Sequence, residues 1–241
     1  MEKFEHPIQQ LLLLDDRNPI RNKRNAEGEI MINNDVERYI LTCSMGLSVL
    51  ITATEKAVLS LELLTRSQKK VKESAFSHTE QIQFAIENYM IRSATIYDRA
   101  LIFVNHILDL GVPDQFILHE PMVSNSHVKR YQLSTRLKAL GKACREFKDE
   151  RNAIIHHRSY STEDFNKFAL VVSVNELSAQ AGMKAPYSQK MVKELTNAIV
   201  ITHMMDFEDH LQKIYDDLRR LLDTAMAVYK LRKMSYSDTA R

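Results

Sequence analysis

Residues 79–110 read TEQIQFAIENYMIRSATIYDRALIFVNHILDL and are followed by Gly111-Val112-Pro113. Apolar and small side chains recur in this stretch at three- and four-residue steps, which is the period of an amphipathic helix. The stripe consists of Ile82, Ile86, Tyr89, Ser93, Ile96, Ala100, Val104 and Ile107. Glycine just past a helix end, with proline shortly after it, is a strong stop signal. The sequence therefore predicts one long helix over residues 79–110 and a loop over 112–125.

The helical period continues on both sides of this stretch. We predict further helices over residues 35–64, 126–157, 163–179 and 187–233, with polar connectors between them. The segment 163–179 contains the run Phe168-Ala169-Leu170-Val171-Val172, which would also suit a strand. Because no segment alternates strongly between apolar and polar residues, the predicted fold is all-α, an up-and-down bundle of long antiparallel helices.

The composition agrees with a helical domain. The 241 residues include only 5 Gly and 5 Pro, which disfavours a many-turned β-sandwich. Residues 1–34 lack periodicity and are predicted to be an N-terminal arm or loop. Residues 35–235 are predicted to be a single all-α domain, and residues 236–241 a disordered tail.

Two features predict a cytoplasmic protein with no membrane partner. Cys43 and Cys144 lie far apart in the sequence without a CxxC pattern, which is typical of a protein in a reducing compartment. The longest aliphatic run, Leu11-Leu12-Leu13-Leu14, is far shorter than the ~20 residues that span a bilayer. Acidic residues lie on both sides of it, which is unlike a signal peptide.

The predicted helix over residues 126–157 places an arginine where its pattern requires an aliphatic residue. Its apolar stripe consists of Leu133, Leu137, Leu140, Cys144 and Phe147. Arg151 falls at the centre of this stripe on a helical wheel. A buried guanidinium must be paired. One interpretation is structural, with a buried stem and a head that reaches solvent or a carboxylate. The other is that Arg151 belongs to a functional site.

The neighbouring residues favour a site. Arg151 is followed by Asn152, and His156 comes after four intervening residues. Asn152 and His156 are one helical turn apart and could hydrogen-bond, which would fix the imidazole tautomer. This arrangement resembles the R-x4–6-H signature of HEPN domains (higher eukaryotes and prokaryotes nucleotide-binding), in which a polar residue follows the arginine. His157 also satisfies the spacing, so the active histidine is open between His156 and His157.

The resemblance implies a four-helix core with an extra helix, a homodimer and no cofactor or metal. Many members are metal-independent endoribonucleases of toxin–antitoxin, CRISPR or phage-defence systems, so RNA is the implied substrate and an antitoxin or regulatory protein a further partner. The implied catalytic residues are Arg151, Asn152, His156 and His157. Two alternatives stay open. One is a non-catalytic HEPN-like bundle that binds RNA, a nucleotide or a partner protein, and the other is a helical interaction protein with a chance motif.

These residue types suit metal-independent RNA cleavage, in which the 2′-hydroxyl attacks the adjacent phosphate. Histidine, with a pKa near 6.5, suits the proton transfers to and from the reacting oxygens. Arginine suits the phosphate because its guanidinium is planar and always charged. In this scheme His156 is general base or acid, Arg151 stabilises the phosphate and Asn152 orients the histidine. A two-fold dimer would bring two copies of the motif to one scissile phosphate.

The wheel also raises a structural question about Arg151. Arg151 and His156 lie about 140° apart on an ideal helix. Either the helix ends or bends near Ile155, or Arg151 pairs from the core side with a carboxylate of the helix over 79–110, for which Asp98 is the candidate. That helix resembles HEPN members with a long helix before the motif, through Glu87-Asn88-Tyr89-x-x-Arg92 and Tyr97-Asp98-Arg99.

The near-zero net charge of +2 hides a local excess of basic residues. Residues 127–158 contain nine Lys or Arg and three Asp or Glu, so this segment is +6 and the remainder of the chain −4. A basic strip suits contacts with a phosphate backbone, although a solvated helix face would look the same. The RNA-binding candidates are Lys142, Arg145, Lys148 and Arg158.

Other sites lack support in the sequence. His203, Asp206 and His210 share a helix face, but the two histidines are about 10 Å apart along the axis, which favours a row of surface hydrogen bonds over a metal site. The motifs GxxxxGK[ST], GxGxxG and GxSxG are absent from the sequence.

Overall fold

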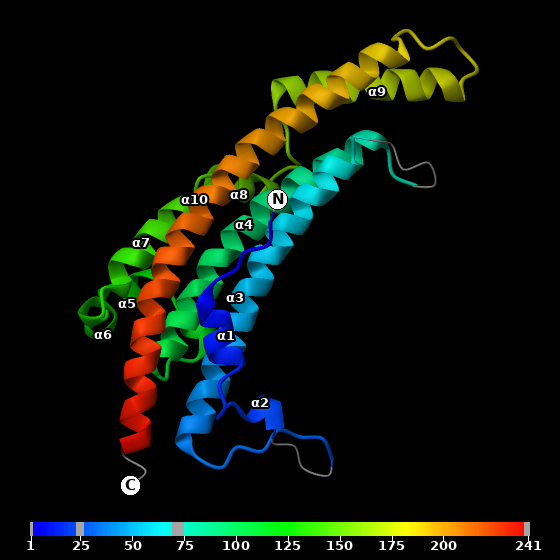
Figure 1. Cartoon of the computed structure of the whole chain (residues 1–241). Coiled ribbons are helices and arrows are strands. Elements are labelled where there is room, and N and C mark those ends of the chain that lie inside the picture. The colour runs from blue at the N-terminus through cyan, green and yellow to red at the C-terminus, as the bar shows by residue number, and fades with distance from the viewer. Residues whose placement is uncertain (1, 23–26, 69–74, 239–241) are drawn as a thin grey trace. The chain divides into compact units, whose positions relative to one another are not determined.

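The computed structural model describes residues 2–22, 27–68 and 75–238, and within these ranges the chain forms helices and no extended strand (Figure 1). The helices are α1 (Pro7–Leu13), α2 (Pro19–Asn22), α3 (Asp35–Arg66), α4 (His78–Leu108), α5 (His119–Ser124), α6 (Ser126–Arg130), α7 (Leu133–Cys144), α8 (Lys148–His156), α9 (Glu163–Gln180) and α10 (Gln189–Asp238), with a short 3-10 turn over Asp114–Phe116. The predicted all-α bundle of long helices is confirmed.

The chain divides into two compact units, each with its own core. We call residues 56–93 and 147–211 the motif unit, because they include the Arg-His motif. We call residues 2–55, 94–146 and 212–238 the terminal unit, because they include the two ends of the described chain. The long helices α3, α4 and α10 contribute residues to both units.

In the terminal unit α3 and α4 run antiparallel at close range. The start of α3 meets the end of α4, where the Tyr39 hydroxyl donates to the Ile107 carbonyl over 2.8 Å. Gly46 makes the close approach feasible, because a Cβ at this position would lie 2.6 Å from Nδ1 of His106. Side chains from both helices fill the core, including Ile40, Leu47 and Phe103, none of which is exposed to solvent.

The N-terminal segment differs from the predicted arm in containing two short helices. Pro7 occupies the first turn of α1, and the His6 side chain and Gln9 form a capping box. Ile8 and Leu12 are fully buried, and Nε2 of His6 lies 3.1 Å from Oδ1 of Asp223 on α10. A helix of seven residues contains too few turns to produce a recognisable period. Lys23 and Arg24 lie outside the described residues.

In the motif unit α9 and the first part of α10 form a helical hairpin, seen as the yellow and orange segments of Figure 1. The run from Phe168 to Val172 lies in α9 and is helical. The Thr162 side chain accepts a hydrogen bond from the Phe165 N–H over 3.2 Å and so caps the helix. Phe165, Phe168 and Val172 are buried at helical spacing, which a strand could not place on one face.

The prediction of a single helix over residues 126–157 is wrong, because this segment forms three helices, α6, α7 and α8. The first break occurs at Gln132, which has a left-handed backbone with φ of 59°. The second break follows Cys144, where the N–H groups of Arg145 and Glu146 bond back three residues instead of four. The apolar stripe therefore ends before Arg151, and α8 begins as a new helix in the motif unit.

The C-terminal boundary also differs from the expectation. Residues 236–238, predicted as part of the tail, continue α10, and residues 239–241 lie outside the described chain. Among the described helices, none combines the length and the apolar character that a transmembrane crossing requires.

Candidate functional site

The Arg-His motif lies on α8, a helix of nine residues. Asp149 and Glu150 lie in its first turn, where acidic side chains suit the helix dipole, and His156 lies in its last turn. None of its residues is buried, and Ile155 is 51% exposed despite its aliphatic side chain. The motif helix therefore presents an open face that the remainder of the described chain does not cover.

Aromatic packing holds the N-terminal end of α8. Phe147, the residue before the helix, places its ring edge-on to Phe207 and His210 of α10, with ring centroids 5.3 Å and 4.8 Å apart. This packing explains the second break in the predicted helix. Phe147 is the residue at which the chain enters the motif unit, and its ring contacts lie in that unit.

Hydrogen bonds hold the chain after the C-terminal end of α8. The Tyr160 N–H donates to Oε1 of Glu87 over 2.6 Å, and Nε2 of Gln83 donates to the Tyr160 carbonyl over 2.7 Å. Gln83 and Glu87 are one turn apart on α4, so both can hydrogen-bond to the backbone of Tyr160, one to its carbonyl and the other to its N–H. Tyr160 is only 6% exposed, and its hydroxyl lies 3.1 Å from Nε2 of His203 on α10.

These contacts belong to a buried aromatic–histidine cluster of the motif unit, made of Tyr89, Phe147, Tyr160, His203, Phe207 and His210. The Tyr89 hydroxyl donates its one proton to the Phe207 carbonyl over 2.8 Å. The contact of 2.9 Å with Nδ1 of His210 is therefore one in which the imidazole donates. Burial lowers the pKa of His203, which Asp206 only partly opposes, and burial raises the pKa of Tyr160. Phe147 at the start of α8 and Tyr160 after its end both belong to this cluster.

Arg151 is half-buried and only partly satisfied. Its Nη2 donates to Oδ1 of Asn152 over 3.0 Å. Its Nε is buried and has no hydrogen-bond partner among the described residues. Asn152 thus contacts the guanidinium of Arg151. The sequence pattern led us to expect that Asn152 would instead orient the His156 imidazole, but within the described chain no hydrogen bond joins these two residues.

His156 and His157 are both exposed at the end of α8. Their ring centroids lie 6.2 Å apart and the rings are tilted by 60°. The helix ends at His156, and the N–H groups of His157 and Arg158 both bond to the Ala153 carbonyl. The sequence analysis anticipated that the helix would end or bend near Ile155. Because α8 ends at His156, the position of His157 is not set by the helical period. The choice between His156 and His157 stays open.

The basic residues do not form one strip along the motif helix. Lys142 belongs to α7, and Arg145 follows that helix with its guanidinium 5.5 Å from the centre of the Tyr97 ring, both in the terminal unit. Lys148 and Arg158 are exposed in the motif unit. Residues 148–158 contain three basic and two acidic side chains, a balance of +1. Most of the +6 excess therefore lies outside α8.

The residues of α4 that resemble HEPN members form hydrogen bonds within the protein. Glu87 holds Tyr160, Nδ2 of Asn88 donates to the Ser60 hydroxyl over 3.0 Å, and Nε of Arg92 donates to Oδ1 of Asn88 over 3.2 Å. Asp98 belongs to the terminal unit and Arg151 to the motif unit, and their pairing stays a prediction.

Sequence reasoning missed the scaffold around Tyr160 and His203. His210 was expected on a helix surface and is instead fully buried, because Phe147 and Tyr89 cover it. Tyr160 stands outside any regular helical pattern, so periodicity could not identify it. The described residues contain no group of three or more His, Cys, Asp or Glu arranged to hold a metal ion.

An all-α chain with an arginine, a following polar residue and a histidine at the end of an exposed helix defines a HEPN-type domain. The sequence model of the HEPN_Cthe2314-like HEPN family matches residues 31–231, and the chain belongs to this family. The match extends over α3 to most of α10 and includes the whole motif. No curated protein and no solved structure matches the chain.

Proposed function

We propose that this protein is a metal-independent endoribonuclease of the HEPN type. The observation that supports the proposal is the open face of α8, on which a family member presents an incompletely satisfied Arg151 beside two exposed histidines. A cation for a phosphate and imidazoles for proton transfer are the groups that the reaction requires.

The reaction is an attack of the ribose 2′-oxygen on the adjacent phosphorus. A base removes the 2′-hydroxyl proton as the new P–O2′ bond forms, and an acid gives a proton to O5′ as the P–O5′ bond breaks. The products are a 2′,3′-cyclic phosphate and a 5′-hydroxyl. The charge that develops on the phosphorane oxygens is met by a guanidinium, which is planar and does not deprotonate.

A homodimer would complete the site. Each chain supplies one motif with one arginine, whereas the reaction requires both an acid and a base beside the phosphate. A two-fold axis places the same patch of each protomer face to face, so two motifs could flank one phosphate. The exposed Ile155 on α8 is the type of side chain that such contact would cover.

Within this scheme Arg151 contacts the phosphate, and His156 or His157 transfers protons. Asn152 is a positioning residue for Arg151, because its oxygen already accepts a guanidinium proton. Lys142, Arg145, Lys148 and Arg158 are the proposed RNA contacts. The biological setting that we propose is phage defence or a toxin–antitoxin pair, with an antitoxin or regulatory protein as partner.

Labelled RNA incubated with the purified protein in excess EDTA tests the activity. We expect cleavage by the wild-type chain, loss of cleavage in a His156→Ala, His157→Ala double variant, and wild-type cleavage in His127→Ala, which removes an exposed histidine of α6. A substrate with a single 2′-deoxy residue should resist cleavage at that position. Cleavage that survives the double substitution would contradict the mechanism, and RNA binding without cleavage would favour the non-catalytic alternative.

An Asp98→Asn variant tests the proposed support of Arg151. If Asp98 pairs with Arg151, the substitution should lower both the free energy of unfolding and the cleavage rate. Combined with Arg151→Lys, the two changes should be less than additive.

A further inference from the structure

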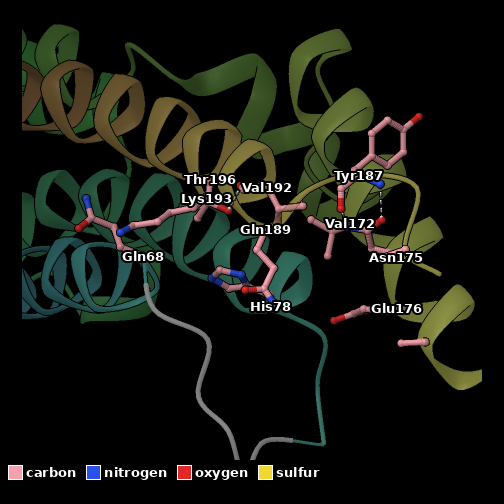
Figure 2. A pocket seen from close by; sticks show the side chains of 12 residues that line it. Gln68, His78, Val172, Asn175, Glu176, Tyr187, Gln189, Val192, Lys193 and Thr196 are labelled. Carbon is pink, nitrogen blue, oxygen red and sulfur yellow. Dashed lines mark hydrogen bonds between the residues drawn. The ribbon is translucent and has the colours of Figure 1, made fainter.

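The motif unit contains a cavity of about 710 Å³ that the ribonuclease proposal does not use. It lies where the α9–α10 hairpin meets the end of α3 and the start of α4 (Figure 2). Cavities that hold small organic ligands are commonly of about 300–1,000 Å³. The size and the convergence of four helices make it a candidate ligand site.

One part of the cavity wall is apolar. Its residues are Val172, Ala179, Ala185 and Val192. Asn175 also lines the wall, but its amide is committed to the turn of the hairpin, donating to the Tyr187 carbonyl over 2.8 Å and accepting from the Tyr187 N–H over 3.1 Å. Figure 2 shows the Tyr187 ring turned away from the cavity. This part of the wall suits a hydrocarbon group.

The other part of the wall is polar, and its Gln189 and Lys193 side chains are exposed to solvent. On the side away from Tyr187 in Figure 2, the Lys193 side chain extends toward Gln68, and the Gln189 amide lies beside His78. His78 is buried, and its Nε2 must donate to the Ser67 carbonyl, 2.5 Å away, because a carbonyl can only accept. Across residues 2–22, 27–68 and 75–238, Lys193 has no ion-pair partner and the Gln68 and Gln189 side chains have no hydrogen-bond partner.

These side chains select the charge of a ligand. An ammonium and two amide NH₂ groups favour an anionic head group with several acceptor oxygens. In Figure 2 Glu176 extends from α9 below Val172, and its carboxylate end points toward His78 and Gln189. A carboxylate in the wall disfavours a ligand that carries more than one negative charge.

We propose that this cavity binds a small amphiphilic monoanion, with a carboxylate against Lys193, Gln68 and Gln189 and a hydrocarbon body against Val172 and Val192. The proposal concerns binding alone and stands whether or not the protein cleaves RNA. Because the cavity wall joins α9 to α10, an occupant should raise the unfolding temperature of the protein.

Calorimetric titration of the full chain with octanoate, 1-octanol and octylammonium tests the proposal. The three probes share a hydrocarbon chain and differ in head-group charge. We expect octanoate to bind most tightly, octanol more weakly and octylammonium weakest. A Lys193→Gln variant should lose about fivefold to tenfold in octanoate affinity and leave octanol unchanged. The matched control is Lys190→Gln, which removes an exposed ammonium three residues away, outside the cavity wall, and should bind octanoate as the wild type does.

A second variant locates the hydrocarbon body. Ala179→Phe adds a ring to an exposed position of the cavity wall and should weaken octanoate and octanol together. The proposal is overturned if the three probes bind equally, if none binds, or if Lys193→Gln and Lys190→Gln behave alike. It is also overturned if Ala179→Phe leaves both affinities unchanged while the variant remains folded.

Discussion

The backbone N–H of Tyr160 donates to Oε1 of Glu87 across 2.6 Å, and this bond fixes the residue four positions after His156. Replacing Glu87 by Ala leaves a largely buried N–H without its charged acceptor. We expect Glu87→Ala to lower the free energy of unfolding by about 1.5–3 kcal/mol, and Glu87→Gln, which keeps an acceptor oxygen, by clearly less. Urea unfolding of the two variants measures the difference.

The matched control for this prediction is Glu62→Ala. Glu62 lies in the same unit and forms an exposed ion pair of 3.7 Å with Arg66 one turn away on α3. Such a pair contributes little, so the variant should remain within about 0.5 kcal/mol of the wild type. A loss in Glu87→Ala no larger than that in Glu62→Ala would show that the Glu87 carboxylate does not hold the loop after α8.

The stability of the motif unit should fall in mild acid because of His203. Burial against Tyr160 and Phe207 lowers the pKa of His203 below its ordinary value, and Asp206 only partly restores it. The folded state thus binds fewer protons than the unfolded state between the two pKa values. The stabilisation is present above pH ~6.5 and is lost as the pH falls through the folded pKa.

A His203→Gln variant isolates this contribution, since glutamine can still hydrogen-bond to the Tyr160 hydroxyl and does not titrate. Urea unfolding at pH 7.5 and pH 5.5 gives the pH dependence of each protein. We expect the wild type to lose more stability between these pH values than the variant loses. If both proteins lose the same stability between pH 7.5 and pH 5.5, the pKa of His203 is not lowered by folding.

Gly46 should be intolerant of alanine although it lies inside a helix. Alanine normally stabilises a helix interior by about 0.5–1 kcal/mol relative to glycine. Here the added Cβ would meet Nδ1 of His106 at 2.6 Å and push away a side chain whose Nε2 is 3.2 Å from Oδ1 of Asp114. We expect Gly46→Ala to destabilise the protein by about 1–3 kcal/mol in thermal unfolding.

The double variant Gly46→Ala, His106→Ala checks the cause of that loss. Removing the imidazole provides room for the new methyl group, so the double variant should lose less than the sum of the two single variants. Additive losses would mean that Gly46 is required for another reason.

Sequence periodicity was sufficient for the long helices and insufficient for their breaks. The helices over α3, α4, α9 and α10 were predicted to within a few residues, because each has a continuous apolar stripe at helical spacing. The segment 126–157 looked equally continuous, yet it is broken before α8. The break depends on the contacts of the Phe147 ring with Phe207 and His210, which are about 60 residues away in the chain.

The motif itself could be recognised from spacing, but its contacts could not. The family match confirms the HEPN resemblance drawn from Arg151, Asn152 and His156. The partner of Asn152 depends on side-chain conformations at the end of a short helix, and a bond to the adjacent Arg151 has no periodic signature. The hydrogen bonds of Gln83 and Glu87 to the Tyr160 backbone join segments more than seventy residues apart, so no local sequence pattern predicts them.

The pair of Arg151 and Asn152 leads to the most direct test of the proposed chemistry. Lysine in place of Arg151 keeps the charge and loses the planar fork that can bind Asn152 and a phosphate together. If Arg151 stabilises the developing phosphorane charge, Arg151→Lys should lower the single-turnover cleavage rate by about 10²–10³-fold with little change in RNA affinity by fluorescence anisotropy. Asn152→Ala, which removes a positioning contact, should cost about tenfold.

Arg66→Lys is the matched control, because Arg66 is an exposed arginine of the same unit that pairs with Glu62 on α3 and has no place in the proposed site. It should cleave at close to the wild-type rate. The three variants must unfold at wild-type temperatures for the comparison to count, since Arg151 is half-buried and a loss of folding would also stop cleavage. If a folded Arg151→Lys protein cleaves as fast as the wild type, Arg151 has a structural role and does not stabilise the phosphorane charge. The phosphate charge would then have to be met by another cation, and Lys148 on the same helix would be the first to test.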